Sequence, residues 1–141
     1  MEPLRETIRI RVRFSEVDAL RMVWHGCYMQ YLEDAREAFG RKYGLTYLHI
    51  YDSGYVAPIA DLRVQYRQPA TIDDVLLVEI TCPPTPGAKL VFDYRITKEQ
   101  DASLVLTATT IQLFMTREGV FEPSSPDFFD AWKEKVRRME N

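Results

Sequence analysis

The sequence contains one long segment with the periodicity of a helix, set among segments with the periodicity of strands. Between residues 28 and 44 the apolar side chains recur at helical spacing, at Tyr28, Tyr31, Leu32, Ala35, Ala38 and Phe39. Polar side chains fill the opposite side, and Gly44 is a typical C-terminal stop. The segment therefore predicts a single amphipathic helix of about four to five turns.

Alternating apolar and polar side chains predict strands on both sides of this helix. Residues 7–14, TIRIRVRF, alternate as a half-buried strand does. Further strands are predicted after the helix, at residues 60–67, 75–82, 89–98 and 104–116. Because the connections between them are short, we expect antiparallel neighbours. Residues 126–139 carry apolar side chains at helical spacing and predict a closing amphipathic helix.

This order of elements predicts an α+β fold, in which an antiparallel sheet packs around one central helix and a second helix follows at the C-terminus. The whole chain, residues 1–141, fits one domain, since 46% hydrophobic residues suffice for a core. In the later strands, the alternate positions that point to the other face of the sheet are also partly apolar. They include Val91, Val105, Ile111 and Leu113. We therefore expect a partner subunit to cover the other face of the sheet.

Composition and charge narrow the classes of function. The chain has no secretion-like leader and no run of eighteen apolar residues, which favours a soluble cytoplasmic protein without a membrane span. A formal net charge of −3 disfavours an extended nucleic-acid interface. The sequence has no glycine-rich phosphate loop and no G-x-S-x-G motif. With only His25 and His49 and no cysteine pair at ligand spacing, we expect no metal site.

The remaining candidate for chemistry is the segment FSEVDALRMVWHGCY at residues 14–28. It contains an isolated carboxylate, Asp18, shortly before His25 and the start of the predicted helix. Helix starts expose unpaired N–H groups that Ser, Thr, Asp or Asn usually cap, and the His25-Gly26-Cys27 step offers none of these. Amides near Gly26 can polarise a ligand carbonyl, because glycine permits close approach. The alternatives are that water or Gly26 itself satisfies the helix start and that Asp18 is an ordinary turn residue.

Four stretches together resemble one family of enzymes. They are V-R-F-S-E-V-D at residues 12–18, V-W-H-G-C-Y at 23–28, Y-L-E-D-A-R-E at 31–37 and Y-R-Q-P-A-T-I-D-D at 66–74. Each is weak alone, but their combination and order resemble the hotdog-fold acyl-CoA thioesterases of the 4-hydroxybenzoyl-CoA thioesterase family. The resemblance covers nearly the whole chain.

The resemblance implies a hotdog fold and the hydrolysis of an acyl-CoA thioester to a free acid and coenzyme A, with no additional cofactor. It places the catalytic carboxylate at Asp18, as nucleophile or as general base, and the amides that bind the thioester oxygen at His25 and Gly26. It also implies sites between paired subunits, in a homodimer or a homotetramer. The chain departs from the family in the Leu20-Arg21 stretch and at Cys27, which leaves the acyl group of the substrate open.

Several side chains are further candidates for this site. His25 is a catalytic candidate that would act as a base or orient Asp18, and its alternative is a hydrogen-bonded packing role. Tyr28 is a candidate for the acyl pocket, with a place in the core as the alternative. Arg63 and Arg67 are candidates for binding the phosphates of coenzyme A, with an ordinary charged strand face as the alternative.

Three other interpretations stay open at this point. A Cys27–His25 pair would be a nucleophile and base, because a helix start lowers the pKa of a thiol. An acyl-thioester dehydratase or hydratase on the same fold would depend on a histidine together with an acid. A non-catalytic acyl-CoA-binding protein would hold the thioester without turnover.

Overall fold

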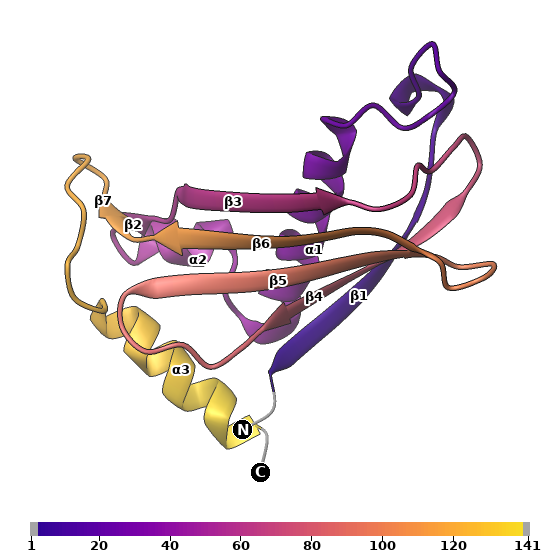
Figure 1. The fold of residues 1–141 in the computed structure, drawn as a ribbon. Helices are drawn as coiled ribbons and strands as arrows, with labels where there is room; N and C mark the ends of the chain where they lie inside the picture. Colours follow the sequence, from indigo (N-terminus) through magenta and orange to yellow (C-terminus); the bar gives the residue numbers. More distant parts are fainter. Residues whose placement is uncertain (1–2, 140–141) are drawn as a thin grey trace.

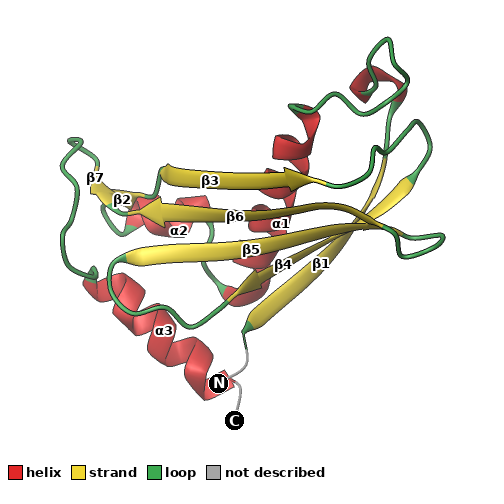
Figure 2. Ribbon diagram, viewed as in Figure 1, coloured by secondary structure: helices red, strands yellow, loops and turns green. Residues whose placement is uncertain are grey.

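The computed structural model describes residues 3–139. Five strands form one antiparallel sheet in the order β1-β4-β5-β6-β3, and β2 and β7 form a separate two-stranded sheet (Figures 1 and 2). The elements in chain order are β1 (Leu4–Arg11), a short 3₁₀ turn (Phe14–Glu16), α1 (Cys27–Tyr43), α2 (Tyr47–Asp52), β2 (Tyr55–Val56), β3 (Ile59–Tyr66), β4 (Val75–Cys82), β5 (Lys89–Lys98), β6 (Leu104–Leu113), β7 (Met115–Thr116) and α3 (Asp127–Met139). None of the described helices is long and apolar enough to cross a membrane.

The predicted central helix is confirmed as α1, which lies against one face of the sheet (Figure 1). Its buried side chains include Tyr28, Tyr31, Leu32, Ala35 and Phe39, which are the residues that the helical period assigned to the apolar side. The helix ends as predicted at Gly44, which has a left-handed conformation (φ 75°) and donates its N–H to Gly40 O. On the sheet, alternate residues of β4 and β5 are buried as well. The core therefore lies between α1 and one face of the sheet.

The predicted C-terminal helix is confirmed as α3, which packs its apolar side on the end of α1. The Trp132 indole stacks on Phe129 with 5.7 Å between ring centroids, and its ring lies 6.4 Å from that of Phe39. The indole Nε1 donates a 2.8 Å hydrogen bond to Tyr43 O. This bond satisfies one of the carbonyl groups that the end of α1 leaves unpaired. The helix α3 thus completes the core at the end of α1 that is remote from Gly26.

The first strand differs from its prediction at both ends. It spans residues 4–11 rather than 7–14, and Phe14, predicted to be buried in the strand, is 80% exposed in the 3₁₀ turn. The strand ends because Glu16 Oε1 accepts the N–H of Arg13 at 2.8 Å and turns the chain. Side-chain acceptors of this kind compete with strand pairing. The turn leads directly into the segment that contains Asp18.

The predicted strand at residues 104–116 is two strands. The break falls at Phe114, whose ring is fully buried against Phe129 and Phe128 at centroid distances of 4.6 and 5.5 Å. Because Phe114 packs on α3, the chain leaves the large sheet, and Met115 pairs with Val56 instead. The alternating pattern alone does not indicate this change of partner.

A short helix, α2, lies between α1 and β2, where the sequence pattern predicted no helix or strand. It spans only Tyr47–Asp52, and the Thr46 hydroxyl caps it by accepting the N–H of His49 at 3.1 Å. Six residues are too few to reveal a helical period, so the pattern gave no sign of this element. Strands β3, β4 and β5 keep their predicted bounds to within one residue at each end, whereas the two-residue strand β2 was not predicted.

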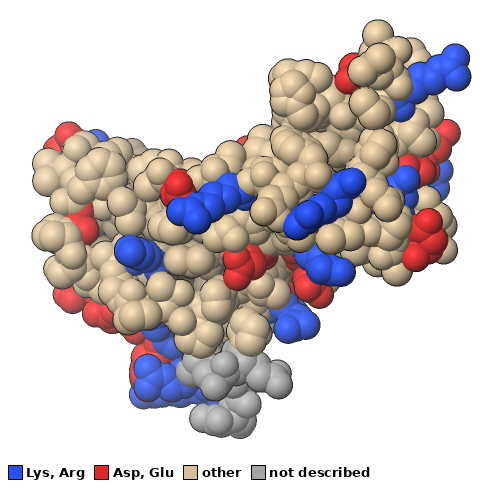
Figure 3. All heavy atoms as spheres, viewed as in Figure 1, with Lys and Arg blue, Asp and Glu red and all other residues tan. Residues whose placement is uncertain are grey.

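The outer face of the sheet is more polar than predicted. Val91, Ile111 and Leu113 are half-buried, but the next cross-strand pair on the same face is Asp93 and Thr109, with the Thr109 hydroxyl donating to Asp93 Oδ1 at 2.7 Å. Basic and acidic side chains are interspersed over this face (Figure 3). A partner that covers this whole face would bury charged groups, so the edges of the sheet are better candidates for subunit contact.

Candidate functional site

Asp18 lies in a tight hairpin at residues 17–23, just before α1. Val17 and Val23 form an isolated antiparallel bridge, and the Asp18 N–H donates to Met22 O at 2.8 Å. One oxygen of the Asp18 carboxylate, Oδ1, accepts the N–H of Leu20 at 2.9 Å and that of Met22 at 3.4 Å. The side chain is therefore partly buried and held by its own loop. Within residues 3–139, its other oxygen, Oδ2, accepts no hydrogen bond.

Glu16 ties this hairpin to α1. Its carboxylate accepts a hydrogen bond from the Tyr31 hydroxyl at 3.0 Å, and its carbonyl oxygen accepts the N–H of Trp24 at 2.9 Å. Tyr31 is almost completely buried, and burial beside this carboxylate raises the pKa of its phenol, so the phenol remains a hydrogen-bond donor. The loop that carries Asp18 is thus fixed to the first turns of the central helix.

The start of α1 has no side-chain cap. Gly26 is the N-cap residue, and no side chain accepts a hydrogen bond from the first turn. The N–H of Cys27 donates to Trp24 O at 2.8 Å, whereas in the described part of the chain the N–H groups of His25 and Gly26 donate to no other group. Uncapped N–H groups and the helix dipole make this point electropositive. The arrangement can stabilise negative charge that develops on an oxygen atom.

Trp24 covers one side of Gly26. A Cβ atom on Gly26 would lie 2.1 Å from the indole ring, so only glycine allows the ring to rest there. The Trp24 side chain is 51% exposed and lies 4.8 Å from the His25 ring, centroid to centroid. Gly26 therefore permits close approach, and in this structure the group that approaches is a side chain of the same protein.

The connection between β3 and β4 holds the hairpin from the other side. Ala70 O accepts the N–H of Val23 at 2.8 Å, and the Thr71 hydroxyl donates to Arg21 O at 2.7 Å. The Tyr66 hydroxyl donates to His25 O at 3.2 Å. The motifs at residues 12–18, 23–28 and 66–74, which are far apart in the sequence, therefore converge around the start of α1.

Tyr28 and the two arginines lie in different surroundings. Tyr28 is 3% exposed, and its hydroxyl accepts the N–H of Ala70 at 3.3 Å, so its ring is part of the core beneath the site. Arg63 is exposed on β3 and pairs with Asp61 at 3.2 Å, while Arg67 donates to the side chain of Gln65. Because side chains alternate along a strand, Arg63 projects from the face of β3 opposite to Tyr66. Within one subunit, Arg63 therefore does not point towards the start of α1.

His25 and Cys27 do not form a reactive pair. In the described residues, the His25 side chain accepts and donates no hydrogen bond, either to Asp18 or to Cys27, and it is exposed. Burial and the nearby Glu16 carboxylate raise the pKa of the Cys27 thiol. A nucleophilic cysteine needs the opposite shift, so the structure disfavours the Cys27–His25 alternative.

Three further residues shape this site through contacts that the sequence does not indicate. Glu16 anchors the hairpin, Trp24 covers Gly26, and Tyr66 binds the carbonyl group of His25. All three belong to the motifs quoted above, and this membership was the signal that the sequence offered. No group of three or more His, Cys, Asp or Glu side chains in residues 3–139 is arranged to hold a metal ion.

Comparison with known proteins identifies the family. The thioesterase-like superfamily matches the chain over residues 12–133, and the chain belongs to this superfamily. The chain is 26% identical over 133 residues to a putative acyl-CoA thioesterase, YneP, of Bacillus subtilis, a match that covers 92% of this chain and 95% of the relative. The resemblance predicted from the four motifs is thereby confirmed.

Solved structures confirm the hotdog fold. A 1,4-dihydroxy-2-naphthoyl-CoA thioesterase from Synechocystis superimposes with a TM-score of 0.83 at 21% identity, over 97% of this chain and 98% of that one. A mutant 4-hydroxybenzoyl-CoA thioesterase in complex with 4-hydroxybenzoyl-CoA gives a TM-score of 0.79 at 22% identity, over 91% of this chain and 97% of that one. The antiparallel sheet with one central helix is thus the architecture of thioesterases with known structures.

Proposed function

We propose that this protein is an acyl-CoA thioesterase that hydrolyses a thioester to a free acid and coenzyme A. Membership of the thioesterase-like superfamily supports this activity. The observation that carries the proposal for the site is the position of one carboxylate, Asp18, in a hairpin fixed to the uncapped start of α1. A carboxylate next to unpaired amide donors is the combination that acyl transfer requires.

In the proposed reaction, Asp18 Oδ2 attacks the carbonyl carbon of the thioester or removes a proton from the water that attacks it. The N–H groups of His25 and Gly26 stabilise the negative charge that develops on the carbonyl oxygen. The carbon–sulfur bond then breaks and the thiolate of coenzyme A leaves. In the general-base route, the thiolate takes up the proton that Asp18 removed from water. In the nucleophilic route, water hydrolyses the mixed anhydride formed at Asp18, which releases the free acid, restores the carboxylate and supplies the proton for the thiolate. The two N–H groups that bind Asp18 both donate to Oδ1, so Oδ2 stays available for the reaction. This geometry supports the proposed role of Asp18. The Trp24 indole has to move aside for a thioester to reach Gly26 from its side.

The roles of the other candidates follow from their surroundings. His25 would orient the substrate or the water through its exposed ring, rather than through a hydrogen bond to Asp18. Arg63 and Arg67 would bind coenzyme A phosphates, since both guanidinium groups are accessible. Tyr28 would support the floor of the acyl site from the core. A cytoplasmic location accords with an acyl-CoA substrate.

A thiol-release assay over a panel of acyl-CoAs tests the proposed activity. We expect at least one aliphatic or aromatic acyl-CoA to release free thiol with saturable kinetics. Tight binding of every acyl-CoA without release of thiol would contradict the proposal and favour a binding protein. Reversible hydration of an enoyl-CoA without thiol release, abolished by His25→Ala but not by Asp18→Asn, would favour a dehydratase or hydratase.

We also propose a homodimer that forms through the free edge of β3. The opposite edge of the sheet, β1, is covered in part, because the Tyr43 hydroxyl binds both the N–H and the carbonyl oxygen of Arg5. The β3 edge has no such cover in the described residues, and Ile59, Leu62 and Tyr66 on this strand are 43%, 44% and 52% exposed. Unpaired strand edges readily pair with a second copy. Such a pairing would also bring a second subunit next to the start of α1, because Tyr66 contacts His25.

Replacing Leu62 with Asp is expected to convert the dimer into a monomer, because the pairing would bury the new charge. Light scattering coupled to size-exclusion chromatography measures the mass directly. Leu48→Asp is the matched control, since Leu48 is 67% exposed and belongs to α2 rather than to β3, and this variant should keep the mass of the wild type. A monomeric wild-type protein, or a dimer that survives Leu62→Asp unchanged, would refute the β3 interface.

A further inference from the structure

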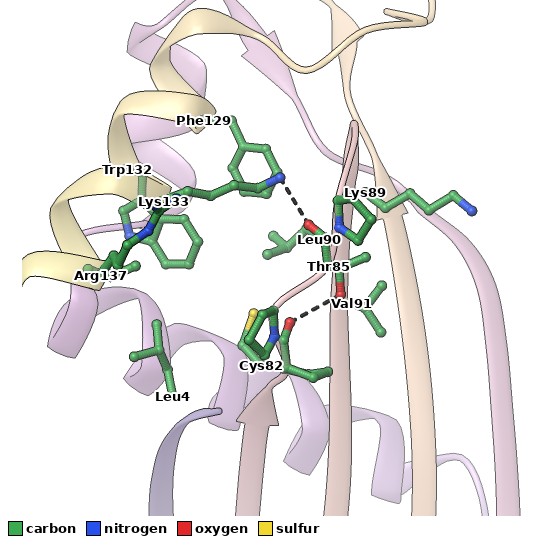
Figure 4. A pocket seen from close by; sticks show the side chains of 14 residues that line it. Leu4, Cys82, Thr85, Lys89, Leu90, Val91, Phe129, Trp132, Lys133 and Arg137 are labelled. Atoms are coloured by element: carbon green, nitrogen blue, oxygen red, sulfur yellow. Dashed lines mark hydrogen bonds between the residues drawn. The ribbon is translucent and has the colours of Figure 1, made fainter. Parts of the chain in front are cut away.

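A cavity of about 550 Å³ lies between α3 and the adjoining ends of β4 and β5 (Figure 4). The rings of Phe129 and Trp132 form one wall and Leu90 and Cys82 form the opposite wall, while the Val91 side chain projects from the other face of β5. The cavity is at the α3 end of the molecule, whereas the hairpin with Asp18 projects at the other end, beyond the start of α1 (Figure 1). It is therefore separate from the proposed catalytic site. Its size lies within the range of about 300–1,000 Å³ that is typical of small-molecule sites.

A contact between α3 and the β4–β5 loop holds the cavity open. The Lys133 ammonium group donates to Thr85 O at 3.1 Å and to Gly87 O at 2.9 Å, and it lies 4.4 Å from the centre of the Phe129 ring. The β4–β5 loop, PPTPGA at residues 83–88, is rich in proline and therefore stiff. A stiff loop tied to α3 in this way cannot collapse into the space, so the cavity is pre-formed.

The chemistry of the lining selects an apolar ligand with negative charge. Carbon atoms dominate the walls, while the charged side chains that line the cavity are Lys89, Lys133 and Arg137, with no Asp or Glu among the lining residues. The Lys89 ammonium group points away from the cavity, which leaves Lys133 and Arg137 as the cations on the α3 side (Figure 4). Burial raises the pKa of the Cys82 thiol to about 12, so the thiol stays neutral and adds no negative charge.

We propose that this cavity is a binding site for a long-chain carboxylate, that is, a free fatty acid. The alkyl chain lies between Phe129 and Trp132 on one side and Leu90 and Cys82 on the other. The carboxylate lies at the mouth of the cavity near Arg137, which pairs at present with Glu134 at a distance of 3.6 Å. A guanidinium group can bind this carboxylate while it remains near Glu134, because it has five N–H donors. Binding at this site does not depend on the proposed thioesterase activity.

Tryptophan fluorescence gives a direct test, since the chain has two tryptophans and one lines the cavity. In the Trp24→Phe variant, Trp132 is the remaining tryptophan. Titration with dodecanoate below its micellar concentration is expected to change the Trp132 emission and to saturate at one ligand per chain. Dodecan-1-ol, with the same chain and no charge, is expected to bind at least about fivefold more weakly. Acetate, with the charge and no chain, is expected to have no effect.

Two neighbouring arginines provide matched variants for the charge. Arg137 and Arg138 both pair with Glu134, but only Arg137 lines the cavity. Arg137→Glu is therefore expected to weaken dodecanoate binding by about tenfold, and Arg138→Glu by less than about twofold. A third variant, Val136→Phe, is expected to abolish binding, because Val136 lines the cavity from α3 and the larger ring would fill the space. Circular dichroism confirms that each variant is folded.

Several results would overturn the proposal. They are a Trp132 signal that does not saturate, equal affinities for dodecanoate and dodecan-1-ol, and equal effects of Arg137→Glu and Arg138→Glu. Amide chemical shifts offer a second measurement that needs no variant in the cavity. Dodecanoate should shift the amides of α3 and of residues 83–88, and shifts confined to the start of α1 would place the ligand in the catalytic site instead. Failure of thiol release with all acyl-CoAs would leave these results unaffected, so the two proposals are tested separately.

Discussion

Replacing Asp18 with Asn is expected to lower kcat for acyl-CoA hydrolysis by about 10²- to 10⁴-fold, which is the usual contribution of a positioned proton acceptor. The change removes the charge but keeps an oxygen that can still accept the N–H groups of Leu20 and Met22, so the hairpin should keep its shape. Thiol release under saturating substrate measures kcat. The KM value should change much less, because the lost interaction belongs to the transition state.

Two controls separate the chemistry from the structure of the loop. Asp101 forms the same kind of turn contact, since its Oδ1 accepts the N–H of Ser103 at 2.9 Å, but it lies in the β5–β6 turn. Asp101→Asn should therefore leave kcat unchanged. Cys27→Ser should also retain activity, because the raised pKa of its thiol is unsuited to a nucleophile. If Asp18→Asn keeps wild-type kcat, or if Cys27→Ser abolishes it, the assignment of Asp18 is wrong.

Replacing Phe39 with Ala is expected to cost about 3–5 kcal/mol of unfolding free energy. Phe39 is fully buried where α1, the sheet and α3 meet, with its ring 4.7 Å from Tyr43 and 5.0 Å from Phe92. The substitution leaves a cavity that these rings cannot fill, because they are held by other contacts. For a chain of this length the loss corresponds to a decrease in Tm of about 10–17 °C. Thermal unfolding followed by circular dichroism measures this decrease.

Phe121→Ala is the matched control for this truncation, because the Phe121 side chain is 56% exposed. Its effect on the free energy of unfolding should stay within about 0.5 kcal/mol. A loss of less than about 1 kcal/mol in Phe39→Ala would mean that α3 and the sheet can move together to close the cavity. The inference that α1, the sheet and α3 pack closely around Phe39 would then be wrong.

Elements with a clear period and a single exposed side could be predicted from the sequence. The helix at residues 28–44 and the strands at 75–82 and 89–98 have such periods, and the structure places them within a residue or two of their predicted bounds. The errors occur where a local contact overrides the period. Phe14 continues the alternation of the first strand, but the contact between Glu16 and Arg13 turns the chain out of the sheet. Phe114 likewise leaves β6 because its ring packs on α3.

The candidate site was predictable in its residue types but not in its contacts. The lack of a capping residue at Gly26 follows directly from the sequence, and the structure has no side-chain cap there. The use of Asp18 Oδ1 by the loop depends on backbone geometry that periodicity does not contain. The position of Trp24 over Gly26 depends on side-chain packing two residues along the chain, which no sequence pattern indicates. Arg63 was selected by charge alone, and charge does not indicate the face of the strand from which a side chain projects.

The contact of Trp132 with Tyr43 has a consequence for synthesis on the ribosome. Phe39 at the end of α1 gains one of its ring neighbours only from α3, which is translated about ninety residues later. A nascent chain that already contains the whole sheet therefore still exposes an aromatic surface at this end. Until α3 packs on this surface, the surface can associate with other apolar chains, and chaperones that recognise exposed apolar side chains are expected to bind there.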